Sequence, residues 1–186
     1  MVGRKIIKKT SILLLFFCFA VIMITGCKKE EEKEEKVQLH EFFYDKLPKS
    51  DQKVSEEENE KIKIGIENWA KSVLMVDSSI GKKNREIIEK NFYQSIVNEK
   101  QREKIKKDRK NFYKDSEVRI QSTEATIEEA YATEYEGRKI GDVACKVVVK
   151  GKKNGRAFSR SYQLKLAVSY EKEIVSVYEI GDIIWK

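Results

Sequence analysis

The sequence predicts an α+β domain in which N-terminal helices pack on a curved, cone-shaped antiparallel β-sheet. Apolar residues recur at steps of three and four between Ile62 and Val76, which is typical of one buried helix face. After Asp115 the apolar period changes to two, as in strands with one buried and one solvated face. Only one long apolar run precedes these elements, which excludes a polytopic membrane protein.

The first element is predicted to be an export signal. Four basic residues precede the apolar run over residues 12–24: Arg4, Lys5, Lys8 and Lys9. The thirteen residues of this run would span about 20 Å as a helix, well short of a hydrocarbon core of about 30 Å. Removal of the segment is therefore favoured, with an uncleaved signal anchor as the alternative.

The end of this run, Ile24-Thr25-Gly26-Cys27, resembles the lipobox of bacterial lipoproteins. In that family the cysteine thiol receives a diacylglyceryl group, and cleavage just before the cysteine makes it the first mature residue. The resemblance implies that residues 1–26 are a signal peptide and that Cys27 carries the lipid. Because two acyl chains give stable attachment, it also implies a protein anchored to the cell membrane on its extracytoplasmic face.

Residues 27–54 are expected to form a charged, flexible tether. Residues 28–36 hold four lysines and five glutamates and no apolar side chain, a composition typical of solvated chain. The aromatic residues at 42–44, ahead of Pro48, either pack on the domain or touch the membrane. The sequence leaves both alternatives open.

The domain is expected to span residues 55–186 and to begin with a helix of about twenty residues. Ser55 and Glu58 have the spacing of a capping box, which satisfies free amide groups at a helix start. Polar and small residues at 77–81 are expected to end the helix. Its buried face is predicted from the apolar stripe: Ile62, Ile66, Trp69, Val73 and Val76.

Two further helices are predicted. The helix over residues 83–97 aligns Ile88, Phe92 and Ile96, while Ile87 and Tyr93 widen its apolar face.

The next helix, over residues 99–112, has only Ile105 and Phe112 as apolar anchors. Its basic residues are dense enough to suggest contact with phosphate or lipid headgroups, and a solvated helix face is the alternative. This predicted patch comprises Lys100, Arg102, Lys104, Lys106, Lys107, Arg109 and Lys110.

Strands are predicted from residue 118 onward. Val118 and Ile120 are expected to open a first strand, and residues 131–135 form a second. A third strand turns residues 143–149 inward at every second position. Glycine, lysine and asparagine at 151–155 indicate a turn.

The clearest alternation follows this turn and predicts one buried face: Phe158, Tyr162, Leu164, Leu166, Val168 and Tyr170. Residues 171–173 are expected to turn the chain again. A last strand over residues 174–185 closes the sheet, with an irregularity at Gly181.

Charge and cysteine content limit the function. Removal of residues 1–26 takes away four of the 38 basic residues and none of the 31 acidic ones, so the net charge falls from +7 to +3. Nucleic-acid binding therefore gains no support from the total charge. Cys18 lies in the predicted signal peptide and Cys27 is the predicted lipid site, so Cys145 is the one cysteine left with a free thiol. It alternates with valines, which favours a small core residue over a nucleophile.

The residues give no support for an enzyme. The only histidine, His40, lies in the predicted tether, and the sequence has no glycine-rich phosphate loop and no cluster of metal ligands. We therefore expect no cofactor, no metal and no catalytic constellation. Asp77, Asp142 and Asp182 are expected to act as cap or turn residues rather than general bases.

Residues 55–186 resemble the NTF2-like superfamily, in which a cone-shaped sheet wraps around N-terminal helices. The resemblance depends on the stripe over residues 62–76, the helix over 87–96 and the hairpins over 143–184. A cystatin-like fold is the alternative. With its predicted lipid anchor, the chain is similar to the extracytoplasmic domains of VirB8-type and TcpC-type conjugation proteins and to small lipoproteins of Gram-positive bacteria.

This resemblance implies an assembly module that binds a protein partner or itself, within a conjugation or secretion apparatus. The competing hypothesis is a carrier that holds a small apolar ligand inside the cone, lined by Trp69, Phe158, Tyr162 and Tyr170. A third hypothesis is nucleic-acid contact through residues 100–110.

Overall fold

The computed structural model describes residues 41–171 and 174–186. These residues belong to one compact unit, His40–Lys186. The predicted signal peptide, Cys27 and most of the predicted turn at 171–173 lie outside the described residues. The elements are the 3-10 turn η1 (Tyr44–Lys46), α2 (Glu56–Trp69) with its π-helical extension η2 (Ala70–Leu74), α3 (Lys82–Gln94), α4 (Glu99–Tyr113), β1 (Val118–Tyr135), β2 (Arg138–Lys153), β3 (Arg156–Ser169) and β4 (Ser176–Trp185).

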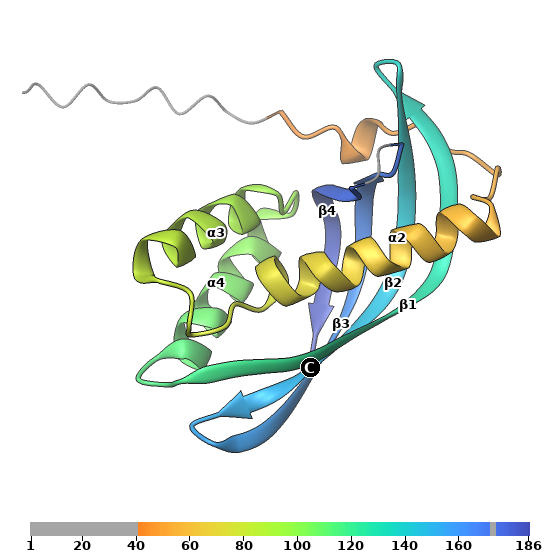
Figure 1. Cartoon of the computed structure of the whole chain (residues 1–186). Helices are drawn as coiled ribbons and strands as arrows, with labels where there is room; N and C mark the ends of the chain where they lie inside the picture. The colour runs from red at the N-terminus through yellow and green to blue at the C-terminus, as the bar shows by residue number, and fades with distance from the viewer. Residues whose placement is uncertain (1–40, 172–173) are drawn as a thin grey trace, which may run out of the picture. The chain divides into compact units, whose positions relative to one another are not determined.

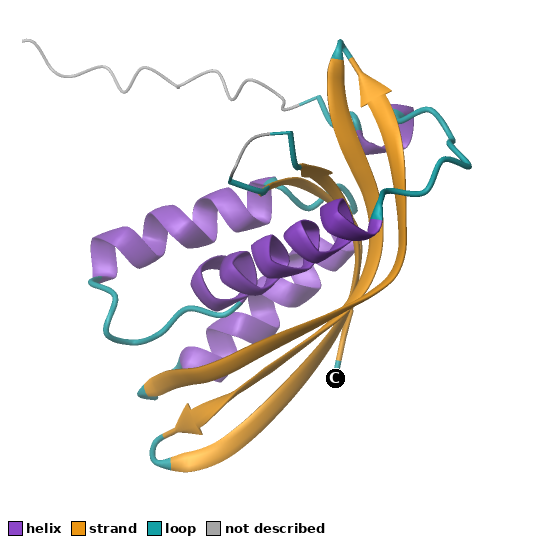
Figure 2. Ribbon diagram, turned by 45° about the vertical axis from the view of Figure 1, so that its right-hand side comes forward, coloured by secondary structure: helices purple, strands orange, loops and turns teal. Residues whose placement is uncertain are grey.

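The four strands form one antiparallel sheet in the order β1-β2-β3-β4. The sheet is curved but not closed, and α2 crosses its concave side (Figure 1). A turned view shows all three helices on this side of the strands (Figure 2). The predicted α+β arrangement, helices on a curved antiparallel sheet, is confirmed.

The prediction of two separate strands, one opening at Val118 and another over residues 131–135, was wrong, because a single strand, β1, covers both. Its middle is rich in glutamate and threonine, which hides the strand from a hydrophobicity pattern. As an edge strand with one solvated face, β1 tolerates these residues, and Lys150 of β2 lies 2.9 Å from Glu124. Two bulges, at Ile120/Ser122 and Ile127/Glu129, further shift the alternation.

The predictions for the last two strands are confirmed, except that β4 begins at Ser176 and not at residue 174. In β3 the side chains of Tyr162, Leu164, Leu166 and Val168 are buried, as is Tyr170 just beyond the strand. In β4 the register skips Gly181, since Lys165 pairs with Asp182 and Leu166 with Ile180. The ring of Tyr44 occupies the space where a side chain at residue 181 would lie.

The first helix begins as predicted but ends earlier. The hydroxyl of Ser55 accepts a hydrogen bond from the Glu58 amide, and the Glu58 carboxylate accepts one from the Ser55 amide, which completes the capping box. The last five helical residues form the π-turn η2, and Met75 is already extended. Val76, predicted as the end of the helical stripe, is buried in the segment after the helix.

In α3 the buried face is narrower than predicted. Phe92 is buried within the helix, whereas Ile87 is 51% exposed and does not widen the apolar face. Ile96 lies beyond the helix end and forms a parallel bridge with Ile180 of β4. Its burial thus comes from the sheet edge rather than from helix packing.

Residues 41–54, assigned to the tether by sequence, are part of the folded unit. The buried carboxylate of Glu179 accepts hydrogen bonds from the amides of Phe43 (3.0 Å) and Tyr44 (2.8 Å). The Phe43 ring stacks on Tyr135 at 4.9 Å. Farther along, Lys53 bridges to Tyr131 at the outer edge of β1. The aromatic cluster at 42–44 therefore packs on the domain, one of the two alternatives that the sequence left open.

Arg109, predicted as part of a surface patch, is instead 1% exposed and is the largest fully buried side chain among the described residues. Its guanidinium donates a hydrogen bond to the carbonyl of Leu74 at the end of η2. It lies 3.6 Å from the carboxylate of Glu89 and 4.7 Å from the ring centre of Phe92, both in α3. One side chain thus joins the end of η2 to α3 and α4.

We expect Arg109→Ala to lower the free energy of unfolding by about 3 kcal/mol, because it leaves a carbonyl and a carboxylate without their buried charged partner. Urea unfolding followed by tryptophan fluorescence measures this change, with Trp69 and Trp185 as reporters. The matched control is Lys110→Ala at the exposed neighbouring position, expected to change stability by less than about 0.5 kcal/mol. Equal effects of the two substitutions would contradict the role of Arg109.

Candidate functional site

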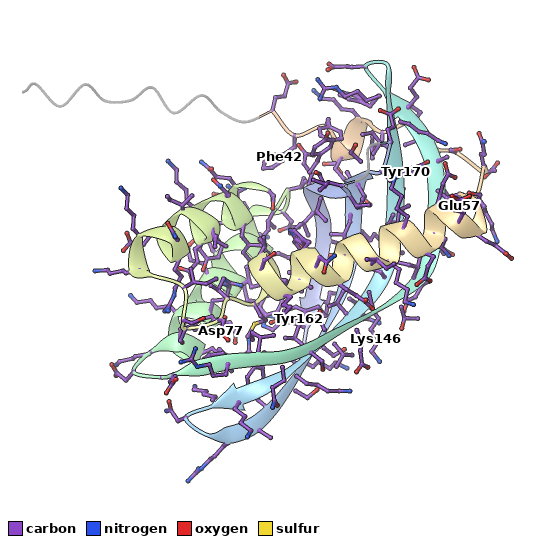
Figure 3. All side chains as sticks on the ribbon, viewed as in Figure 1. Phe42, Glu57, Asp77, Lys146, Tyr162 and Tyr170 are labelled. Carbon is purple, nitrogen blue, oxygen red and sulfur yellow. The ribbon has the colours of Figure 1, made fainter. Side chains whose placement is uncertain are left out.

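An open groove of about 780 Å³ runs along one side of α2. Its other wall is the chain that leads into β4, residues 174–177. The α2 residues that line it recur at steps of three and four from Glu57 to Ser72, so the groove follows the helix axis for about 22 Å at 1.5 Å per residue. Glu57 marks its N-terminal end (Figure 3).

Gly65 allows the two walls of the groove to meet. A Cβ atom at this position would lie 2.3 Å from the Cβ of Val175, far closer than real side chains approach one another. The contact fixes residues 174–177 against the middle of α2. Any larger side chain at residue 65 would push this wall away from the helix.

The centre of the groove is apolar and partly exposed. Ile64 is 51% exposed and Ile174 is 79% exposed, while Trp69, Val175 and Val177 are half-buried beside them. Two exposed isoleucines in one groove are notable in a chain in which 37% of the residues are charged. When a partner covers apolar surface of this kind, the free energy of the complex falls.

Charge is distributed unevenly along the groove. Glu57 and Glu60 lie at its N-terminal end, and Asn68 and Ser72 at the opposite end are neutral. Among the described residues of the lining, the one lysine is Lys61, which donates a hydrogen bond at 2.8 Å to the backbone carbonyl of Tyr170. The N-terminal end of the groove is therefore acidic.

The groove adjoins an edge of the sheet. Among the strands of the described residues, none pairs with the outer side of β4. At Ile180 this side already pairs with an extended segment, because Ile180 donates to the carbonyl of Ser95 at 2.8 Å and accepts from the amide of Val97 at 3.0 Å. The outer edge of β4 is thus able to bond to extended backbone.

The four residues predicted to line an interior ligand site are in different surroundings. Tyr162 is 1% exposed and its hydroxyl lies 3.0 Å from the sulfur of buried Met75, under α2 (Figure 3). Phe158 packs on Phe112 at 5.2 Å. Trp69 lines the groove, and Tyr170 lines a separate pocket with Lys139. At Tyr162 the space between the sheet and the helices is filled by side chains.

The predicted basic patch is only partly a surface. Lys100, Lys104, Lys106, Lys107 and Lys110 are exposed.

The other two members of the predicted patch have structural roles. Arg102 is half-buried with its guanidinium 5.6 Å from the ring centre of Phe42, and Arg109 belongs to the helix junction. The patch therefore consists of lysines.

The three carboxylates considered by sequence each accept hydrogen bonds within the fold. Asp77 accepts from the amides of Ser79 (2.8 Å) and Ile120 (3.0 Å), which makes it a turn residue that also holds β1. Asp142 accepts from the hydroxyl of Tyr44 at 2.8 Å, and Asp182 accepts from Gln101.

The remaining candidates for chemistry are inert or lie elsewhere. Burial raises the pKa of the Cys145 thiol to about 12, so this cysteine is a core residue. Within residues 41–171 and 174–186, no three histidine, cysteine or acidic side chains gather as metal ligands would. His40 lies outside the described residues.

The groove beside α2 was not predicted from the sequence. The signal was present at Ile64, an apolar residue that stands between the buried positions 62 and 66 and so faces away from the sheet. Residue 174 was assigned to a strand, and the need for glycine at residue 65 depends on a contact with a distant segment.

Comparisons of the sequence with known protein families, with curated proteins and with solved structures find no match. Among the residues that the structure describes, no helix is long and apolar enough to cross a membrane.

We expect the stability of the fold to fall as the pH drops from about 5 to about 2. Burial alone would raise the pKa of Asp77, but hydrogen bonds from Ser79 and Ile120 and the charge of Arg119 lower it to about 2. The carboxylate therefore stabilises the fold above the pKa of the unfolded chain, near 4, and this contribution is lost as the pH falls through the folded value.

Asp77→Asn should remove about 1 kcal/mol of this pH-dependent stability, a value reduced because Arg119 is solvent-exposed. Urea unfolding at a series of pH values measures the effect, with Asp45→Asn at an exposed position as the control. An unchanged pH slope in the Asp77 variant would argue against the role of this carboxylate.

Proposed function

We propose that this chain is a membrane-anchored extracytoplasmic lipoprotein that binds a protein partner through the groove beside α2. The lipobox-like residues ending at Cys27 support the anchor. The apolar, partly exposed groove supports the binding role and is the observation that carries it. The resemblance to conjugation proteins favours a conjugation or secretion apparatus as the setting.

We propose an extended segment of another protein as the occupant. A groove of about 22 Å accommodates six or seven residues at 3.3 Å each. The open side of β4 next to the groove offers backbone groups for strand addition, as Ile180 already shows with residues 95–97. Apolar side chains would cover Ile64 and Ile174, and a basic residue would meet Glu57 and Glu60.

The anchor predicts a defined mass. In the native host the protein should lack residues 1–26 and carry a diacylglyceryl group on Cys27, which intact-mass spectrometry of the membrane fraction measures. Cys27→Ala should leave the precursor uncleaved, because cleavage in lipoproteins follows modification of the cysteine. A native protein with residues 1–26 present and an unmodified thiol would refute the anchor.

The groove predicts a site-specific contact in intact cells. A photo-crosslinking amino acid at residue 64 or residue 174 should give a discrete crosslinked product. The matched control is residue 184, where an isoleucine of similar exposure (49%) pairs with exposed Gln163 on the sheet face away from the helices. A product of twice the chain mass would identify a second copy as the partner. The same product from all three positions, or none from residues 64 and 174, would contradict the proposal.

A further inference from the structure

The outer face of α4 carries a lysine at almost every turn. Ile105 and Arg109 point into the fold, and the opposite side of the helix is exposed. The lysines of this side follow one another at steps of three or four residues along the helix and just past its end: Lys100, Lys104, Lys107, Lys110 and Lys114. We call these five residues the lysine face.

Two of the three acidic residues of α4 pair with basic side chains outside the lysine face, and the third is Glu99 in the first turn. The carboxylate of Asp108 lies 2.5 Å from the guanidinium of Arg160, beneath the helix. The carboxylate of Glu103 lies 3.7 Å from Lys106, which is not one of the five. Among residues 41–171 and 174–186, no ion pair involves a member of the lysine face.

The basic surface continues from the end of α4 onto the hairpin between β2 and β3. The ammonium group of Lys153 lies 4.7 Å from the ring centre of Phe112 in α4. Lys152 and Arg156 flank the same turn and are exposed. Positive charge thus extends over two elements that contact each other.

The chain enters the folded unit near the first turn of α4, on the side of the helix that carries Ile105 and Arg109. The ring of Phe42 lies 5.6 Å from the guanidinium of Arg102 in the first turn of α4. The fifteen Cα–Cα steps from Cys27 to Phe42 span at most about 50 Å. If Cys27 carries the lipid, the lysine face begins within this distance of the bilayer.

We infer that the lysine face of α4 binds the anionic lipid headgroups of the membrane that holds the anchor. This inference rests on the proposed membrane anchor and adds a second contact with the same surface. A row of lysines on a convex helix suits a surface of many phosphates, because each lysine near an anionic membrane contributes separately to binding. The anchor would strengthen this binding, because it raises the effective concentration of the domain at the membrane.

The test uses the full chain, reconstituted in vesicles with phosphatidylglycerol or with phosphatidylcholine alone. A fluorophore on Asn111→Cys reports the exposed side of α4, and one on Ser159→Cys reports the far face of the sheet. Buried Cys145 is protected from labelling. Cys18, and Cys27 where intact mass shows it unacylated, are replaced by serine so that the fluorophore occupies only the intended position. Quenching by nitroxide-labelled lipid should appear at residue 111 only with phosphatidylglycerol and should disappear when salt rises from about 0.1 M to about 1 M.

Lys107→Glu/Lys110→Glu should lower the docked fraction at residue 111 at least about tenfold. The matched control, Lys146→Glu/Lys165→Glu, makes the same charge change at exposed positions on the far face and should leave quenching unchanged. Equal quenching in both lipids, or equal loss in both double variants, would overturn the inference. Loss of quenching at residue 111 on addition of a DNA duplex, together with quenching that does not depend on phosphatidylglycerol, would also overturn the inference. That result would indicate nucleic acid as the ligand of the lysine face.

The membrane anchor and the lysine face are tested by separate measurements, so either can be refuted without the other. Intact mass reports whether Cys27 is acylated, whereas quenching at residue 111 reports the lysine face whichever segment holds the chain in the vesicle.

Discussion

The arrangement of the three helices depends on one buried guanidinium. Within the described residues, α3 buries only Phe92 completely, and α4 buries only Ile105 and Arg109. Such a small apolar contribution specifies the packing of two helices poorly. A buried charge, in contrast, is tolerated only in a site that supplies hydrogen bonds and a counter-charge. Because Arg109 finds these on η2 and α3, the three helices are restricted to one relative placement.

The two proposed surfaces follow from this placement and select different chemistry. The groove is apolar with an acidic end, so it favours an apolar segment with a basic residue, and salt should affect it weakly. The lysine face consists of five positive charges, so its attraction for anionic lipid headgroups would be electrostatic and would weaken as the salt concentration rises. The two proposed surfaces lie on different helices, so occupation of one would leave the residues of the other uncovered.

Local sequence patterns predicted the structural features that depend only on neighbouring residues. The capping box at Ser55 and the alternation of β3 need only neighbouring residues, and both are confirmed. The length of β1 was missed, because an edge strand with bulges does not need a regular apolar pattern. Arg109 was assigned to the surface by its charge, although it stands between Ile105 and Phe112 at the spacing of a buried stripe. The groove wall depends on a contact between residues 65 and 175, which are too far apart in the chain for any local pattern to report.

The path of residues 41–54 determines how mechanical force enters the domain. This segment is fastened to β4 through Glu179 and to the edge of β1 through Lys53 before α2 begins. Tension applied at residue 41 is therefore resisted first by amide–carboxylate bonds on the sheet, and α2 stays unloaded until they rupture. The helix wall of the groove would therefore keep its place while the sheet carries the tension.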